Sequence, residues 1–330
     1  MEVTSLSHED GATLLSNLSD LALHDVEEEL ARAQYLPLAI EHCSAYLRQL
    51  GPLNARTYCL EFDKTRQDLP PQLRTGSREA AAIATTCTMA IQTIRRSCKP
   101  AVDLLRVLSF LNPNGVMIEL LISGRKSLGE SLGDFMKDER KMRVALLELE
   151  KFGLIKWVQA NNIVQLHRVV QKIVRDMMRH NEMMSVFANV VDMFYSVLPN
   201  KVTSKTKQIY EKYESQFLEP LGLQSSRSED FAFLNERVGT YFGSINMFTD
   251  CEKLLSEAIT ILAERSADPD CLRVMKILKA AYQLQGKTEQ ASKVHARMEK
   301  LSMEMQRRRE AVGAILGVMN NSIVGDMNLI

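Results

Sequence analysis

The stretch that decides the fold is LIKWVQANNIVQLHRVVQKIVRD, residues 154–176. Residues 155–159 alternate with the period of a strand, and IVQLH at 163–167 can pair with them as a return strand. ANN at 160–162 supplies the turn between them, because asparagine tolerates left-handed backbone angles. Apolar residues then follow at helical spacing: Val169, Ile173, Val174 and Met177. A short β-hairpin set among helices predicts a winged-helix arrangement.

Helical patterns precede the hairpin. Residues 25–50 have apolar positions at helical spacing, and Pro37 should end one helix and begin the next. Residues 79–96 predict a further helix, which a Lys-Pro pair at 99–100 separates from its successor. That successor ends at the NPNG turn of residues 112–115 and has one apolar stripe: Val102, Leu105, Leu108 and Leu111. The helix predicted over 140–155 should turn three side chains inward: Val144, Leu147 and Phe152.

The last third of the chain is helical with signs of a repeat. Its first copy contains Gly239, Phe242, Cys251, Leu255 and Ala258, at steps of 3, 9, 4 and 3 residues. A similar set follows about one helix pair later: Leu278, Tyr282, Gly286 and Ala291. A small residue where two antiparallel helices cross, with an aromatic residue one turn away, is typical of helix-pair repeats.

These patterns predict a mainly α fold in five segments. We expect a disordered tail over residues 1–10, a helical subdomain over 11–98 and a winged helix over 99–182. Antiparallel helix-pair repeats should occupy 183–305, followed by a C-terminal tail over 306–330.

Composition excludes several classes of function. The 41 basic and 41 acidic side chains cancel, so no overall field draws the chain to nucleic acid or to an anionic membrane. The six cysteines form no CxxC pair and the first residues do not form a secretory signal, which indicates reduced thiols and a cytoplasmic protein. Asn320, Asn321 and Asp326 interrupt the apolar C-terminal stretch well short of a membrane span.

Motifs of known enzymes are absent from the sequence. It contains no GxGxxG or GxxxxGK[ST] loop to cradle phosphate, and no GxSxG or HExxH. The histidines are scattered and do not form a cluster of metal ligands. We therefore expect a non-enzymatic protein.

Four short stretches, in order, resemble one family. YLPLAI at 35–40 resembles the GLPLA region of NB-ARC domains, the nucleotide switches of the STAND class. Residues 101–121 look like the first helices of that family's winged-helix subdomain, and residues 145–176 resemble its end. SVLPN at 196–200 resembles the start of the tetratricopeptide repeats in such proteins. The resemblance extends over about residues 10–300.

The resemblance implies a nucleotide site. In this family the proline of the LPLA motif packs near adenine, and a histidine of the MHD-like motif reaches the β-phosphate of ADP. Carried over to this sequence, the cofactor-binding residues would be Pro37, Leu38 and His167. From the residues alone, Pro37 can also be a plain helix start, and His167 a buried histidine bonded to backbone at the wing.

The family's phosphate loop and magnesium-binding acid lie upstream of the LPLA motif. Only about 35 residues precede that motif here, and neither element is present. ADP or ATP binding is therefore expected only if a P-loop half is supplied from elsewhere.

Three functional hypotheses remain. The preferred one is a non-enzymatic regulatory protein that recognises partner proteins through its helical repeats and can oligomerise with a full-length switch. The alternative is an innate-immunity or cell-death type of nucleotide switch whose P-loop half is missing from this chain. The weakest is a winged-helix DNA-binding regulator, with groove contacts from Lys172, Arg175, Arg179 and His180.

Overall fold

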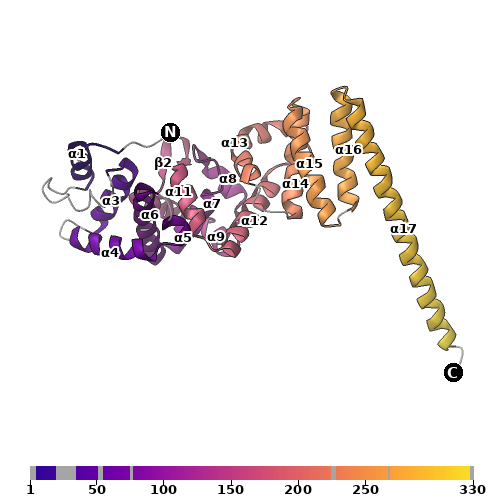
Figure 1. Ribbon diagram of the computed structural model, residues 1–330, viewed down its shortest axis with the longest axis horizontal. Coiled ribbons are helices and arrows are strands. Elements are labelled where there is room, and N and C mark those ends of the chain that lie inside the picture. Colours follow the sequence, from indigo (N-terminus) through magenta and orange to yellow (C-terminus); the bar gives the residue numbers. More distant parts are fainter. Residues whose placement is uncertain are drawn as a thin grey trace. The chain divides into compact units, whose positions relative to one another are not determined.

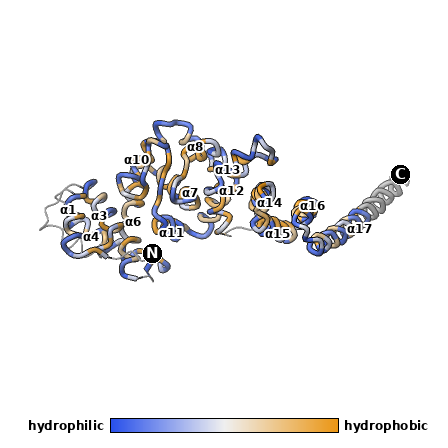
Figure 2. The backbone as a smooth tube through the Cα atoms, turned by 90° about the horizontal axis from the view of Figure 1, so that it is seen from above, coloured by the Kyte–Doolittle hydropathy of each residue, from blue (hydrophilic) through white to orange (hydrophobic). Residues whose placement is uncertain are grey.

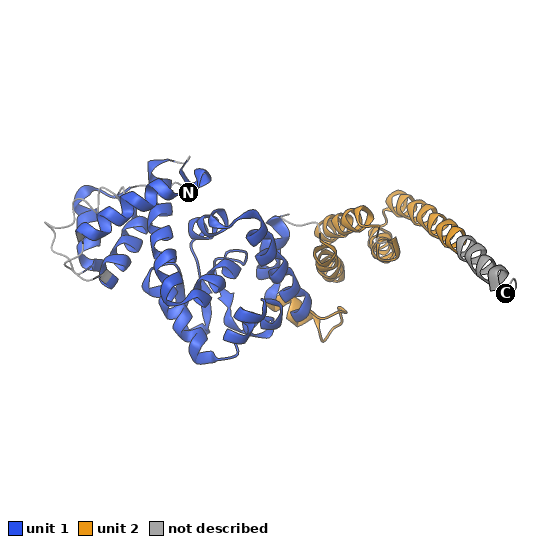
Figure 3. Cartoon of the chain, turned by 90° about the horizontal axis from the view of Figure 1, so that it is seen from below, with its two compact units in different colours: residues 1–197, 213–225 blue, residues 198–212, 226–330 orange. Residues whose placement is uncertain are grey.

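The computed structural model describes residues 5–19, 35–50, 55–74, 77–223, 228–266 and 268–327. Most of these residues are helical, and the strands among them form one small antiparallel sheet (Figure 1). The chain divides into two compact units, shown in blue and orange in Figure 3. Unit 1 comprises Met1–Val197 and Tyr213–Ser225, and unit 2 comprises Leu198–Lys212 and Ser226–Ile330.

Unit 1 begins with a helical subdomain built around one central helix. Its helices are α1 (His8–Ser19), α3 (Pro37–Leu50), α4 (Ala55–Asp68), α5 (Pro71–Arg74) and α6 (Arg78–Ser97). The side chain of Ser77 caps α6, and α3 and α4 both pack against this helix, most of whose residues are buried. The part of the predicted helix before residue 35 lies outside the described residues.

The expected tail over residues 1–10 is partly wrong. Helix α1 begins at His8, and the Ser7 hydroxyl accepts the backbone N–H of Asp10 at 3.1 Å, which is the usual way to cap an N-terminal turn. The backbone N–H of Leu6 also donates to the Tyr35 carbonyl at 2.8 Å. Residues 1–4 of that expected tail lie outside the described residues.

The winged helix follows directly. It consists of α7 (Lys99–Leu108), β1 (Val116–Met117), α8 (Ile118–Ser123), the 3-10 turn η3 (Arg125–Ser127), α9 (Glu130–Phe135) and α10 (Glu139–Lys151), then β2 (Lys156–Val158), the turn η4 (Gln159–Asn161), β3 (Ile163–Gln165) and α11 (Arg168–Met177). The hairpin and the helix after it are confirmed, with Asn162 in the left-handed region at φ 52°. The stripe predicted for α7 and the turn after it is confirmed, because all four residues are buried.

The sheet contains one strand more than the predicted hairpin. β1 pairs antiparallel with β3, with Val116 opposite Val164, so the strand order is β1-β3-β2. A strand of two residues has no detectable alternation, which is why the sequence pattern missed it.

Helix α10 buries a different face from the expected one. Val144 is 54% exposed and Leu147 is half-buried, whereas Phe152 is buried as predicted. The core-facing residues of α10 are Met142, Ala145, Leu146 and Leu149. Two apolar stripes run along this helix, and the packing of α7 and β2 against it decides which of them is buried.

Helix α12 (His180–Val197) packs within unit 1, although residues from 183 onward were expected to form repeats. Its Phe187 meets Phe110 edge-on with ring centroids 5.5 Å apart. Helix α13 (Lys207–Leu223) contributes its later residues to the same unit, where the buried Gln216 amide donates to the Gly115 carbonyl at 2.9 Å.

Unit 2 is a stack of helices in which each packs on the next. They are α14 (Glu229–Ser244), α15 (Phe248–Glu264), α16 (Asp268–Leu284) and α17 (Thr288–Met327). Hydrophobic and hydrophilic positions alternate along α14, α15 and α16 in Figure 2, as expected of helices buried along one side. The close approach predicted at Gly239 is present, because a Cβ there would lie 3.0 Å from the Leu255 side chain.

Two expectations for this region are corrected. Gly286 does not lie where two helices cross; it has a φ of +72° in the turn after α16, a conformation that favours glycine. The segment 306–330 is not a separate tail as far as residue 327, because α17 continues to Met327. Within the described ranges, no helix combines the length and apolarity that a membrane crossing requires.

Candidate functional site

A cleft in unit 1 brings two of the predicted nucleotide contacts together. Leu38 of α3 and His167 at the start of α11 line the same cleft, which has a volume of about 400 Å³. The remaining lining comes from α3, the turn before β1, the segment from the end of α10 into β2, and the end of β3: Glu41, Pro113, Asn114, Gly153, Leu154, Ile155, Lys156, Gln165 and Leu166. The cleft therefore lies between the helical subdomain and the winged helix.

His167 is the N-cap of α11. Its backbone is extended (φ −76°, ψ 137°), and its Nδ1 accepts the backbone N–H of Val169 at 3.2 Å. In the neutral ring that bond places the proton on Nε2, which has no partner among the described residues and can donate to a ligand. The expected bond to backbone is present, but the histidine is exposed and not buried.

Pro37 does not line the cleft. It is the first residue of α3, where the fixed proline φ suits a helix start and its missing N–H costs nothing. The interpretation of Pro37 as a helix start is confirmed, whereas its predicted contact with adenine has no support in the lining of this cleft.

The charges of the cleft fit weak anion binding at most. Lys156 of β2 is an exposed cation with no ion pair to any described residue, and Glu41 of α3 adds a carboxylate to the same lining. The single glycine in the lining, Gly153, cannot form a glycine-rich phosphate loop. No nucleophile with an adjacent base lines the cleft, and no metal-binding group of His, Cys, Asp or Glu occurs in the described part of the chain.

A buried histidine that the sequence patterns missed holds one wall in place. His42 of α3 is fully buried, and its Nε2 lies 3.2 Å from the Gly153 carbonyl, 111 residues away in the sequence. Its Nδ1 lies 3.2 Å from Sγ of Cys87 on α6. Nε2–H therefore donates to the carbonyl and Nδ1 accepts the thiol proton. The ring joins α3, α6 and the turn after α10.

This Cys–His pair is structural. Burial lowers the pKa of His42 to about 4, and burial also raises the pKa of the Cys87 thiol. Both groups are therefore neutral near pH 7, and the thiol is not activated as a nucleophile. The sequence gives only one indication of this pair, which is that His42 lies within the apolar face of the helix that begins at Pro37.

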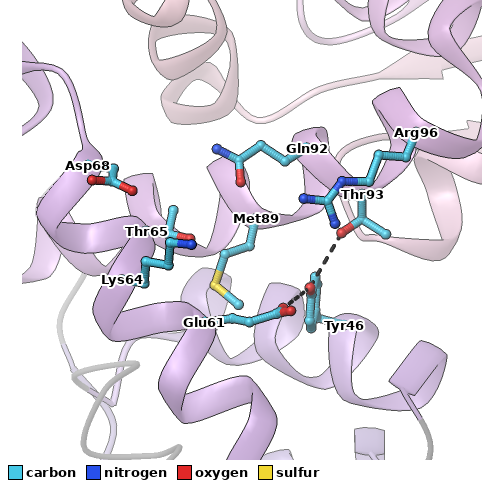
Figure 4. A pocket seen from close by; sticks show the side chains of 9 residues that line it. All are labelled: Tyr46, Glu61, Lys64, Thr65, Asp68, Met89, Gln92, Thr93 and Arg96. Carbon is cyan, nitrogen blue, oxygen red and sulfur yellow. Dashed lines mark hydrogen bonds between the residues drawn. The ribbon is translucent and has the colours of Figure 1, made fainter.

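A second, smaller pocket of about 120 Å³ lies among α3, α4 and α6. Figure 4 shows Tyr46 and Glu61 pointing toward one another, with Thr93 beside them. The Tyr46 hydroxyl donates to Glu61 Oε2 at 2.5 Å and accepts from Thr93 Oγ1 at 3.4 Å. Burial, and then the bond to Glu61, raise the pKa of Tyr46 to about 12. The network links the three helices and leaves the tyrosine protonated.

Residues 92–183 match the model of a family described as "Domain of unknown function (DUF7779)". That match covers the winged helix and the end of α6, and leaves Leu38 and His42 outside. The chain has no significant match among curated proteins.

Proposed function

We propose that this chain is a non-enzymatic regulatory protein that recognises other proteins through its helix-pair unit. The order of a helical subdomain, a winged helix and stacked helix pairs supports this proposal, since it is the order of parts that the NB-ARC resemblance implies. The same resemblance favours a role in signalling of the defence or cell-death type.

The observation that carries the proposal is a groove of about 310 Å³ among α15, α16 and α17. Its apolar lining consists of Ala263, Cys271, Met275 and Leu301. Arg308 is paired with Asp268 at 2.7 Å, and the other charged residues of the lining are Arg297, Lys300 and Glu304, none of which forms an ion pair with a described residue. An apolar lining in which cations outnumber carboxylates suits a partner segment that combines apolar and acidic side chains.

Affinity purification with matched charge reversals tests the proposal. The double variant Arg297→Glu/Lys300→Glu should lose partners that the wild type retains, because the reversal repels an acidic segment. The control Lys253→Glu/Lys276→Glu reverses two exposed lysines that do not line the groove, and it should retain the same partners. Identical partner sets for all three proteins would reject recognition through this groove.

One observation supports a second candidate, the nucleotide switch. Leu38 and His167 line one cleft, and Nε2 of His167 can donate to a phosphate oxygen. This candidate requires a phosphate loop from another segment or chain, because this sequence contains none. Calorimetric titration with ADP and with Mg-ATP, using His167→Ala and the control His180→Ala, tests it. Micromolar binding that only His167→Ala weakens would support the switch, and no binding at millimolar ligand would reject it for this chain.

The DNA-binding candidate has less support. Two of the four expected groove residues are engaged within unit 1: Lys172 bonds to Asp176 at 2.5 Å, and the guanidinium of Arg175 donates to the Ser109 carbonyl. Helix α11 therefore presents no continuous row of free cations.

A further inference from the structure

A second groove, in unit 1, lies outside the proposed functions. It has a volume of about 270 Å³ and lies among α8, α10 and the strand β2. Its apolar lining combines four aliphatic or thioether side chains with the only tryptophan of the chain: Ile118, Ile122, Met142, Leu146 and Trp157. Its polar rim consists of Glu139, Arg143, Gln159 and Asn162. An apolar interior with a few polar groups at the edge is the usual character of a ligand or peptide pocket.

We propose that this groove binds an extended or helical segment of another protein, with an apolar side chain in the groove and a carboxylate beside Arg143. The apolar surface continues outside the groove on the same helix. Val144 is 54% exposed and Leu147 is half-buried, and neither lines the groove, so α10 has apolar side chains outside the groove as well as in it. A peptide lying along α10 would cover both residues.

Charge indicates the character of the partner. The Arg143 guanidinium lies over the Trp157 ring, 5.4 Å from its centroid, and Arg143 Nη2 donates to the Gln159 side chain at 3.5 Å. Neither Arg143 nor the nearby exposed Arg140 forms an ion pair with a described carboxylate. A carboxylate supplied by the partner would gain a charge-assisted bond to Arg143, which is already held in place by the ring. Glu139 lies one helical turn before Arg143 on α10, so a second carboxylate on that side of Arg143 would be repelled.

A buried donor supplies an independent observation. The indole Nε1–H of Trp157 is inaccessible to solvent and has no hydrogen-bond partner in the described part of the chain. An unpaired buried donor is unfavourable, so an acceptor from the partner that reaches this edge of the ring would add to binding.

The surface favours protein over nucleic acid. A nucleic-acid interface presents a row of cations to the phosphates. The segment from the end of α9 to the first turn of α10 instead mixes both signs and pairs internally, with Lys137 bonded to Asp134 at 2.6 Å and Lys141 close to Asp138 at 3.9 Å. The exposed Val144 in the middle of the helix would face phosphate with no compensating contact.

Selection from a random peptide library displayed on phage, against the immobilised full chain, tests the proposal. Enriched peptides should combine an apolar anchor with Asp or Glu. Synthetic copies should change the fluorescence of the full chain, because its single tryptophan lines the groove. The variant Arg143→Glu should weaken their binding by about tenfold or more, the effect of losing one charged contact.

Arg95→Glu is the matched control, since Arg95 is an exposed cation of α6 with no described ion pair, and it should bind the peptides like the wild type. The variant Arg297→Glu/Lys300→Glu should also bind them normally, which separates this groove from the one in unit 2. Failure to enrich any peptide, or equal binding by Arg143→Glu, would overturn the proposal. So would competition by duplex DNA, or a fluorescence change caused by self-association of the chain alone.

Discussion

Acidification should destabilise unit 1 through His42. The neutral ring donates from Nε2 to the Gly153 carbonyl and accepts a proton from the Cys87 thiol through Nδ1. A second proton on the ring would place a positive charge in a site with no water-accessible surface, and Nδ1 could no longer accept the thiol proton. The folded unit therefore resists protonation of this histidine, and the unfolded chain does not.

The magnitude follows from the pKa. Burial lowers the pKa of His42 from 6.5 to about 4; the bond to the Gly153 carbonyl partly opposes this, and the charge of His167 adds a smaller lowering. Above pH 6.5 the ring is neutral in both states, and its full contribution to stability is present. As the pH falls toward 4, the unfolded chain takes up a proton that the folded chain refuses. Because each pH unit is worth about 1.4 kcal/mol, this group removes about 3 kcal/mol of unfolding free energy across that window.

Urea unfolding at pH values from about 7 to about 4, followed by Trp157 fluorescence, measures this loss in the unit that contains His42. The variant His42→Gln can still donate to the carbonyl but does not titrate. Its stability should be lower at neutral pH, and its decline with acid should be shallower than that of the wild type by about 3 kcal/mol.

His180→Gln, which removes an exposed histidine of the same unit, should leave the wild-type pH dependence unchanged. Parallel curves for the wild type and His42→Gln would refute the reasoning. An NMR titration that places the pKa of His42 near 6.5 in the folded protein would refute it as well.

Four further predictions concern close packing, backbone conformation and hydrogen bonds, and urea unfolding measures each of them. Gly239→Val should destabilise unit 2 by about 1–3 kcal/mol, because even the added Cβ would lie 3.0 Å from a leucine of α15. The control Gly222→Ala, with nothing within 4 Å of the new methyl, should be neutral or stabilising. Equal effects of the two substitutions would contradict close packing at Gly239. Gly286→Ala should lower the free energy of unfolding by about 1–2 kcal/mol, because alanine is disfavoured in the left-handed backbone conformation of this residue. Gly153→Ala should lower the free energy of unfolding by more than Gly286→Ala, because the added Cβ would also lie 3.2 Å from the buried ring of His42. A smaller loss than at Gly286 would show that the ring can move away. Tyr46→Phe should lose about 1–2 kcal/mol at neutral pH. Between pH 10 and about 12 the unfolded chain loses the Tyr46 hydroxyl proton while the folded chain keeps it, because folding raises the pKa of Tyr46. The wild type should therefore lose stability over this range and Tyr46→Phe should not lose this contribution. A flat wild-type curve there would contradict the network.

Local patterns predicted much of the fold and only part of the site. The hairpin and the stripe of α7 followed from periods that involve neighbouring residues alone. The family resemblance selected Leu38 and His167, which line one cleft, and also Pro37, which does not line it. No local pattern indicated the bond between His42 and the turn after α10, because its two ends are 111 residues apart.

The sequence by itself determined most of the helices and the β2–β3 hairpin, and it contains no phosphate loop or known catalytic motif, whereas the two-residue strand β1 left no pattern in it. Only the tertiary structure decided which apolar stripe of α10 is buried, leaving Val144 on the surface beside a groove. The physical reason is that secondary structure depends on the order of neighbouring side chains along the backbone. Burial of one face of α10 and of the His42 ring depends instead on elements that are distant in the chain and come into contact only when the chain folds.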